Sequence, residues 1–137
     1  IAGPLSYTVI IEMYLAHNPS RAATEAEAMH KRYPSCRLFA WQLGESYKKL
    51  ERFNDAERVF TGIAESMRGD AHDDGSGEVR SWWKLAVLAK TVGKTDKCLY
   101  YCKKIVNYPG KNGDSVFGRQ RDRIGKARDL IEDIENE

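Results

Sequence analysis

Few residues in this chain of 137 could bind a metal ion. The clearest candidate is the segment Asp70, His72 and Asp74, which resembles part of a calcium loop because oxygen ligands alternate along it. Such a loop needs a bidentate acid at its twelfth position, and that position holds Ser81. Since Gly and Asp also favour turns, we interpret residues 69–77 as a polar connection and predict no metal site.

Residues for nucleophilic or redox chemistry are equally sparse. The chain has three cysteines, an odd number that does not form a disulfide framework. Cys98 and Cys102 are four residues apart, which places them on one helical face as small buried hydrophobic residues. The histidines are His17, His30 and His72. None lies in a nucleophile, phosphate-loop or zinc motif, so we expect no enzymatic activity and no cofactor.

Charge and hydropathy exclude several further classes. Basic and acidic residues number 22 and 20, without the clear basic excess typical of nucleic-acid-binding proteins. A nucleic-acid alternative rests on a basic set in the C-terminal third, opposed by the acidic residues 132–137: Lys103, Lys104, Lys111, Arg119, Arg121 and Arg123. No run approaches the ~20 apolar residues of a membrane span.

The N-terminal residues carry no visible targeting signal. The chain starts Ile1-Ala2-Gly3-Pro4, without Met and without a basic segment before an apolar run. We therefore expect a fragment of a longer protein that is soluble, with the cytoplasm slightly favoured.

Hydrophobic periodicity predicts an all-helical chain. Gly, Pro and Asn residues interrupt the sequence at regular intervals, near residues 18–19, 34, 53–54, 69–77, 93 and 109–113. Between them, apolar residues recur at spacings of three and four, which is typical of amphipathic helices. Residues 38–50 form the clearest helix, and we expect Asn54 or Asp55 to cap the next one.

An internal repeat accounts for this pattern. Six apolar or small positions recur at an offset of 42 residues. They are Leu43, Gly44, Tyr47, Ala56, Phe60 and Ile63, which correspond to Leu85, Ala86, Ala89, Cys98, Cys102 and Ile105. A weaker copy lies 34 residues earlier, where Val9, Ile10, Met13, Ala22, Ala26 and Met29 match the first set.

The repeat resembles the tetratricopeptide repeat (TPR) family, a helix-turn-helix unit of 34 residues. Leu43, Gly44, Tyr47, Ala56 and Phe60 fit its signature, and Trp82, Leu85 and Ala86 fit it again in the next unit. Pro34 and Pro109 fall at or beside its closing proline. The sequence departs from the family at Ala40, which replaces the leading Trp of the second unit, at Arg68, and in eight inserted residues before the third unit.

The resemblance implies a right-handed α-solenoid of three antiparallel helix pairs plus a C-terminal capping helix. The whole chain would then form one domain, with repeats at approximately 3–36, 37–70 and 79–112 and the capping helix at 114–136. Each pair leaves an apolar face open, so neighbouring pairs must stack. The function that this implies is protein–protein interaction, as a scaffold or adaptor.

In TPR proteins the first helix of each pair lines a concave groove. Carried over by position, the groove residues are Tyr7, Ile11 and Tyr14; Trp41, Glu45, Lys48 and Lys49; and Arg80, Trp83, Val87 and Lys90. Trp41 and Trp83 each lie two residues before a core leucine, so we predict that both point away from the packed face. We expect the groove to hold a peptide or partner helix through aromatic anchors flanked by positive charge.

Two alternatives qualify this prediction. The tryptophans could instead pack against a neighbouring helix. The second alternative is self-association, or packing within a longer repeat protein, through an apolar face that Leu5, Val9 and Ile10 expose at the first unit. A homodimer is therefore a candidate assembly. Some TPR domains grip a terminal carboxylate with asparagines, but those positions here hold Ile11, Glu45 and Val87.

Overall fold

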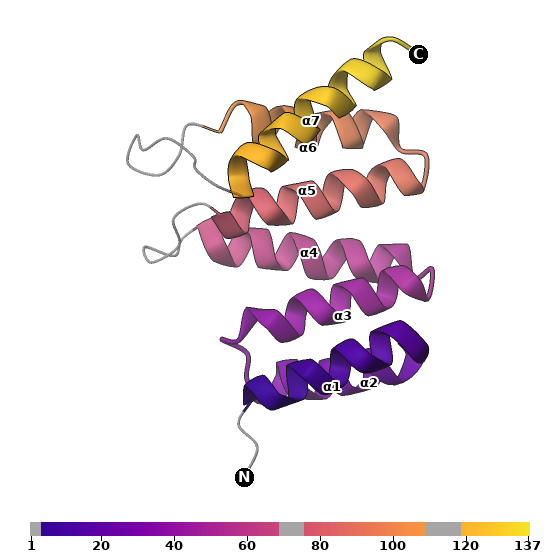
Figure 1. Cartoon of the computed structure of the whole chain (residues 1–137), viewed down its shortest axis with the longest axis vertical. Helices are drawn as coiled ribbons and strands as arrows, with labels where there is room; N and C mark the ends of the chain where they lie inside the picture. The colour runs from indigo at the N-terminus through magenta and orange to yellow at the C-terminus, as the bar shows by residue number, and fades with distance from the viewer. Residues whose placement is uncertain (1–3, 69–75, 109–118) are drawn as a thin grey trace. The chain divides into compact units, whose positions relative to one another are not determined.

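The computed structural model describes residues 4–68, 76–108 and 119–137, with the side chains of residues 119 and 120 excepted. All secondary structure in these residues is helical, in seven helices (Figure 1). They are α1 (Pro4–His17), α2 (Pro19–Arg32), α3 (Arg37–Lys49), α4 (Phe53–Arg68), α5 (Ser76–Thr91), α6 (Thr95–Val106) and α7 (Arg119–Glu135). The expected all-α class is confirmed for this part of the chain.

The chain divides into two compact units, residues 1–60 and 61–137, with the boundary inside α4. Local signals set the helix ends of the first unit. Asn18 lies between α1 and α2, and its Oδ1 accepts a hydrogen bond from the Arg21 backbone N–H at 3.2 Å. Pro19 opens α2, where its missing N–H costs nothing. Asn18 therefore caps α2 and separates it from α1 by one residue.

The turn between α3 and α4 differs from the sequence prediction. Glu51 adopts the left-handed conformation, with φ of 58°, and the Arg52 N–H donates to the Tyr47 carbonyl at 2.8 Å. The helix α4 then begins at Phe53, so Asn54 and Asp55 lie inside its first turn and the prediction that one of them caps it is wrong. Asp55 instead accepts from the Arg52 Nε at 2.9 Å, which adds a negative charge at the positive helix end.

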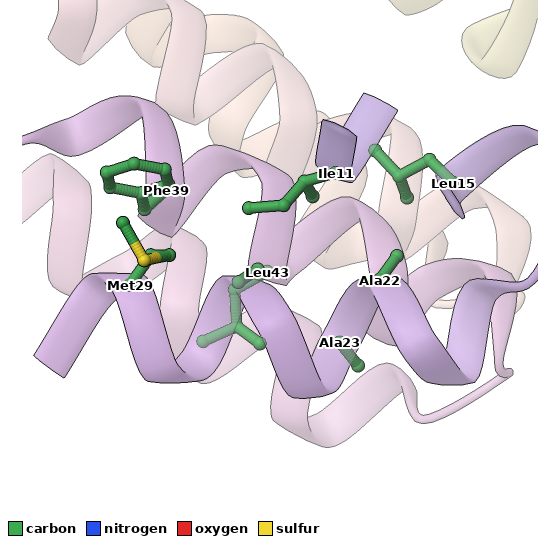
Figure 2. Close-up of a cluster of buried hydrophobic side chains, with 8 residues drawn as sticks. Ile11, Leu15, Ala22, Ala23, Met29, Phe39 and Leu43 are labelled. Atoms are coloured by element: carbon green, nitrogen blue, oxygen red, sulfur yellow. The ribbon is translucent and has the colours of Figure 1, made fainter. Parts of the chain in front are cut away.

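The core of the first unit lies among α1, α2 and α3. Figure 2 shows this cluster, in which small alanines of α2 allow close approach and larger side chains from α1 and α3 fill the space. Its buried members are Ile11, Leu15, Ala22, Ala23, Ala26, Met29, Phe39 and Leu43. Because α3 contributes Phe39 and Leu43, this helix is held directly against the preceding two.

A second face of α3 packs against the first half of α4. Gly44 lies directly under the Phe60 ring, and a Cβ added at Gly44 would come within 2.6 Å of Phe60 Cζ. The Trp41 and Phe60 ring centroids are 6.1 Å apart with an interplanar angle of 37°. The absence of a side chain at Gly44 therefore allows this approach of the two helices.

In the second unit, α6 packs against α5, and α7 packs against both. Gly93 ends α5 with φ of 79°, a conformation that glycine adopts without steric cost. The helix α5 begins at Ser76, so Gly77 belongs to a helix and not, as the sequence predicted, to the polar connection. Ala127 and Leu130 of α7 are buried, whereas residues 114–118 of the expected capping helix lie outside the described residues.

The internal repeat identifies core positions correctly in its two later copies, but only in part in its first copy. The later set, from Leu85 to Ile105, is entirely buried, and of the earlier set only Tyr47 is partly exposed. In the weaker first copy, Ala22, Ala26 and Met29 are buried, but Val9, Ile10 and Met13 are exposed. No helix among the described residues is long and apolar enough to cross a membrane.

Candidate functional site

Half of the residues of α5 are buried, and the other half lie along one side of the helix. Eight of its sixteen residues are buried, including Glu78, Trp82 and Leu88. Five of the partly or fully exposed residues share a spacing of three or four: Arg80, Trp83, Lys84, Val87 and Lys90. We call this set the α5 stripe. It contains all four residues of α5 that the sequence predicted as partner-binding.

The α5 stripe combines an aromatic ring with positive charge. Trp83 and Val87 supply apolar surface in its centre, and Arg80, Lys84 and Lys90 surround them. The acid nearest in sequence, Glu78, is buried and directed toward Arg68, with 3.7 Å between Oε1 and Nε. The stripe itself contains no carboxylate, so all of its own charged side chains are basic.

Sequence reasoning missed one member of this stripe. Lys84 follows Trp83 directly and lies four residues after Arg80, so the helical spacing that selected Arg80 also selects Lys84. The contact of Lys104 with Trp82 was also missed: the Lys104 Nζ lies 5.0 Å from the Trp82 ring centroid, a cation–π contact of α6 with α5. Nothing in the sequence signalled this second pairing, since it depends on how the two helices pack.

On α3 the predicted residues separate into two groups. Glu45 and Lys48 are partly exposed and Lys49 is exposed, as a groove-lining role requires. The Lys49 Nζ, however, donates to the Leu15 carbonyl at 3.0 Å and so ties α3 to the end of α1. Trp41 is only 6% exposed and packs against Phe60, so the prediction that it points away from the packed faces is wrong.

On α1 the predicted residues face the core. Ile11 is completely buried in the cluster of Figure 2, so its assignment to a ligand-binding wall is wrong. Tyr7 and Tyr14 are partly buried and pack against the same cluster. The face that α1 does expose carries Leu5, Val9, Ile10 and Met13, and the prediction that the first three are exposed is confirmed.

The described residues bring no metal-binding cluster together. Within them, no cluster of three or more His, Cys, Asp or Glu side chains could hold a metal ion. The calcium-like segment falls on residues 69–75, outside the described part of the chain. Ser81, which occupies the position of the missing acid, is buried and donates from Oγ to the Gly77 carbonyl at 2.9 Å. An open recess of about 410 Å³ lies at the turn formed by residues 93–97, and none of the residues that line it belongs to the α5 stripe.

The cysteine pair of α6 is chemically protected. Cys98 and Cys102 are fully buried, as predicted, while Cys36 is partly exposed. Burial, reinforced by the neighbouring Cys98 thiol, raises the pKa of Cys102 to about 12. Burial also raises the pKa of Cys98, against a smaller lowering by its hydrogen bond with Cys102. Because the thiolate is the nucleophile, both thiols should be inert in the folded protein.

We expect iodoacetamide at pH 8 to label Cys36 first and the other two cysteines only when α6 opens. Intact-mass spectrometry over time should show one fast addition, which a Cys36→Ser variant loses, and three additions in denaturant. Two fast additions in the native protein would contradict this structure.

The raised pKa of Cys102 also predicts that the free energy of unfolding falls as the pH rises from 9.0 toward about 12, because only the unfolded thiol ionises there. A Cys102→Ala variant should lose that part of the pH dependence.

Comparison with models of protein families, with curated proteins and with solved structures found no match to this chain.

Proposed function

We propose that this chain is a protein-interaction module of the TPR type, a right-handed α-solenoid of antiparallel helix pairs that binds an acidic peptide or helix along the α5 stripe. The observation that carries the proposal is the exposure pattern of α5. A helix that is buried on every other side leaves open one line of residues, and that line combines an aromatic anchor with three cations.

The chemistry of the stripe specifies its ligand. Trp and Arg are enriched among residues that dominate binding energy, since they bury a large area at a modest entropic cost. The Trp83 ring and the Val87 side chain would contact an apolar anchor of the ligand, while Arg80, Lys84 and Lys90 would attract its carboxylates. The ligand expected is therefore an acidic segment with one large apolar side chain, presented as a helix or an extended strand.

An array of synthetic peptides tests this proposal. Acidic peptides with a single Leu or Phe anchor should bind the chain more tightly than basic peptides with the same anchor. Trp83→Ala should weaken binding of the acidic peptides by about tenfold or more, since truncating an interface anchor costs ~2 kcal/mol or more. The folding of each variant is checked by circular dichroism.

The matched control is Tyr100→Ala, which removes an aromatic residue of α6 that is 56% exposed and lies outside the stripe. It should leave the affinity unchanged. Equal loss in both variants, or acidic peptides that bind no better than basic ones, would show that the α5 stripe is not the binding surface.

A further inference from the structure

The helix α1 is apolar on two opposite faces. One face supplies Ile11 and Leu15 to the core of the first unit. The other exposes Leu5, Val9 and Met13 in a straight line at spacings of four, with 66%, 62% and 63% of their surfaces accessible, and Ile10 beside them. We call these four residues the α1 ridge. A helix that is hydrophobic all round is usually buried on all sides.

The internal repeat shows what this ridge corresponds to. At the offset of 34 residues, Leu5, Val9 and Met13 match Phe39, Leu43 and Tyr47 of α3. Phe39 and Leu43 are buried in the core of the first unit, and Tyr47 packs against it. In α3 this helical face is thus covered by other helices, whereas in α1 the equivalent face is exposed. Its composition is that of a buried contact surface.

We propose that the α1 ridge is a self-association surface, on which two copies of this chain pair their α1 helices antiparallel about a two-fold axis at Val9. In this register residue i of one copy faces residue 18 − i of the other. Val9 then meets Val9, and Leu5 of one copy meets Met13 of the partner. A two-fold contact of this kind uses the same patch twice and closes after two copies.

The charges of α1 favour the antiparallel pairing. Glu12 is the only acidic or basic residue in Pro4–Ala16. Its Oε1 accepts a hydrogen bond from Gln42 Nε2 at 3.1 Å, which holds it on the α3 side of the ridge. In the antiparallel register Glu12 faces Ser6, so the two Glu12 positions are separated by six residues, about 9 Å along the axis. A parallel pair would place the two carboxylates at the same height along the axis.

A head-to-tail arrangement with the C-terminal helix is disfavoured by desolvation. The exposed surface of α7 is densely charged and would lose its hydration against an apolar ridge. Its exposed side chains include Arg121, Asp122, Lys126, Arg128, Asp129, Glu132, Asp133 and Glu135. The second copy therefore offers the ridge a better-matched surface through its own α1.

The area of the ridge sets the expected strength of the dimer. Each aliphatic side chain carries on the order of 100 Å² of apolar surface, so two ridges exclude roughly 500 Å² from water. Interfaces below about 1,200 Å² in total are typical of transient association. We therefore expect a reversible dimer that forms at high micromolar concentration.

Sedimentation velocity of the full chain, from low micromolar to near-millimolar concentration, tests the association. The average mass should rise toward twice that of the monomer. Val9→Asp should raise the dissociation constant at least tenfold, because it places two carboxylates on the two-fold axis. Tyr100→Asp, which adds the same charge at an exposed apolar residue of α6, should leave the dissociation constant unchanged. Val9 is exposed, so its replacement should leave the circular dichroism spectrum unaltered.

Disulfide trapping tests the register. In a Cys36→Ser background, Val9→Cys should cross-link with itself under mild oxidation. Leu5→Cys should cross-link with added Met13→Cys chains but poorly with itself. A chain that stays monomeric at every concentration would mean that a different helix covers the ridge, and the proposal fails. A dimer that survives Val9→Asp, or one in which Leu5→Cys cross-links best with itself, would also overturn it. None of these outcomes bears on the α5 stripe, which lies in the second compact unit.

Discussion

Replacing Phe39 with alanine is expected to lower the free energy of unfolding by about 3–5 kcal/mol, the usual cost of removing a buried aromatic side chain. Phe39 is fully buried in the cluster shared by α1, α2 and α3, with its ring 6.2 Å from that of Tyr33. Its loss leaves a cavity that the neighbouring alanines of α2 are too small to fill. Urea titration followed by circular dichroism measures the change.

The neighbouring leucine provides the control for this experiment. Leu38 precedes Phe39 on α3 but is 43% exposed, so Leu38→Ala should cost about 1 kcal/mol or less. The ratio of the two losses in the free energy of unfolding shows which side of α3 is turned toward the core. Equal losses at both positions would mean that α3 presents a different face to the core than the one described here.

Gly44→Ala is expected to destabilise the protein although alanine is the better helix former. The added Cβ would overlap the Phe60 ring, which is 99% buried and confined by Trp41. Relief of that overlap requires α3 and α4 to move apart. The overpacking costs about 1–3 kcal/mol, while the gain in helix propensity is ~1 kcal/mol, so we expect a net loss of up to about 2 kcal/mol.

A double-mutant cycle separates these contributions. In a Phe60→Leu background the shorter side chain makes room for the new methyl group, so Gly44→Ala should become neutral or stabilising. Gly62→Ala, in α4, is the matched control, because a Cβ there would meet no atom of the described residues within 4 Å. That change should raise the free energy of unfolding by up to about 1 kcal/mol. A destabilised Gly62→Ala variant, or a Gly44→Ala loss that persists in the Phe60→Leu background, would refute the proposed steric cause.

The two proposed surfaces differ in physical character and therefore in their response to salt. The α5 stripe surrounds its aromatic residue with cations, so binding there should weaken as ionic strength rises. The α1 ridge carries no charge, and association through it should be maintained or strengthened by sulfate, which favours apolar burial. A salt series on the same chain thus distinguishes ligand binding from self-association.

The periodicity and the internal repeat were sufficient to predict the helices and most of their buried positions. Those positions are local in origin: a spacing of three and four defines one face whatever lies opposite it. The exposed apolar face of α1 followed from the same pattern, since at the first repeat no preceding helix among the described residues covers it.

Only some of the predicted binding residues are exposed. Arg80, Trp83, Val87 and Lys90 lie on an open face, whereas Ile11 and Trp41 are buried. Periodicity states which residues share a face but not how many faces of a helix are covered. On α3 two faces are covered, one by α1 and α2 and the other by α4, so Trp41 came to pack on Phe60.

Tertiary packing also decided which polar groups became contacts between helices. Gln42 donates to the Thr8 carbonyl at 2.8 Å, and Lys49 donates to the Leu15 carbonyl, each across 34 residues of sequence. These contacts join residues that local spacing cannot relate, because the crossing of α1 and α3 sets their separation. The amino-acid pattern therefore accounts for the helices and their apolar faces, and the number of neighbours around each helix determines which of those faces remain available for binding.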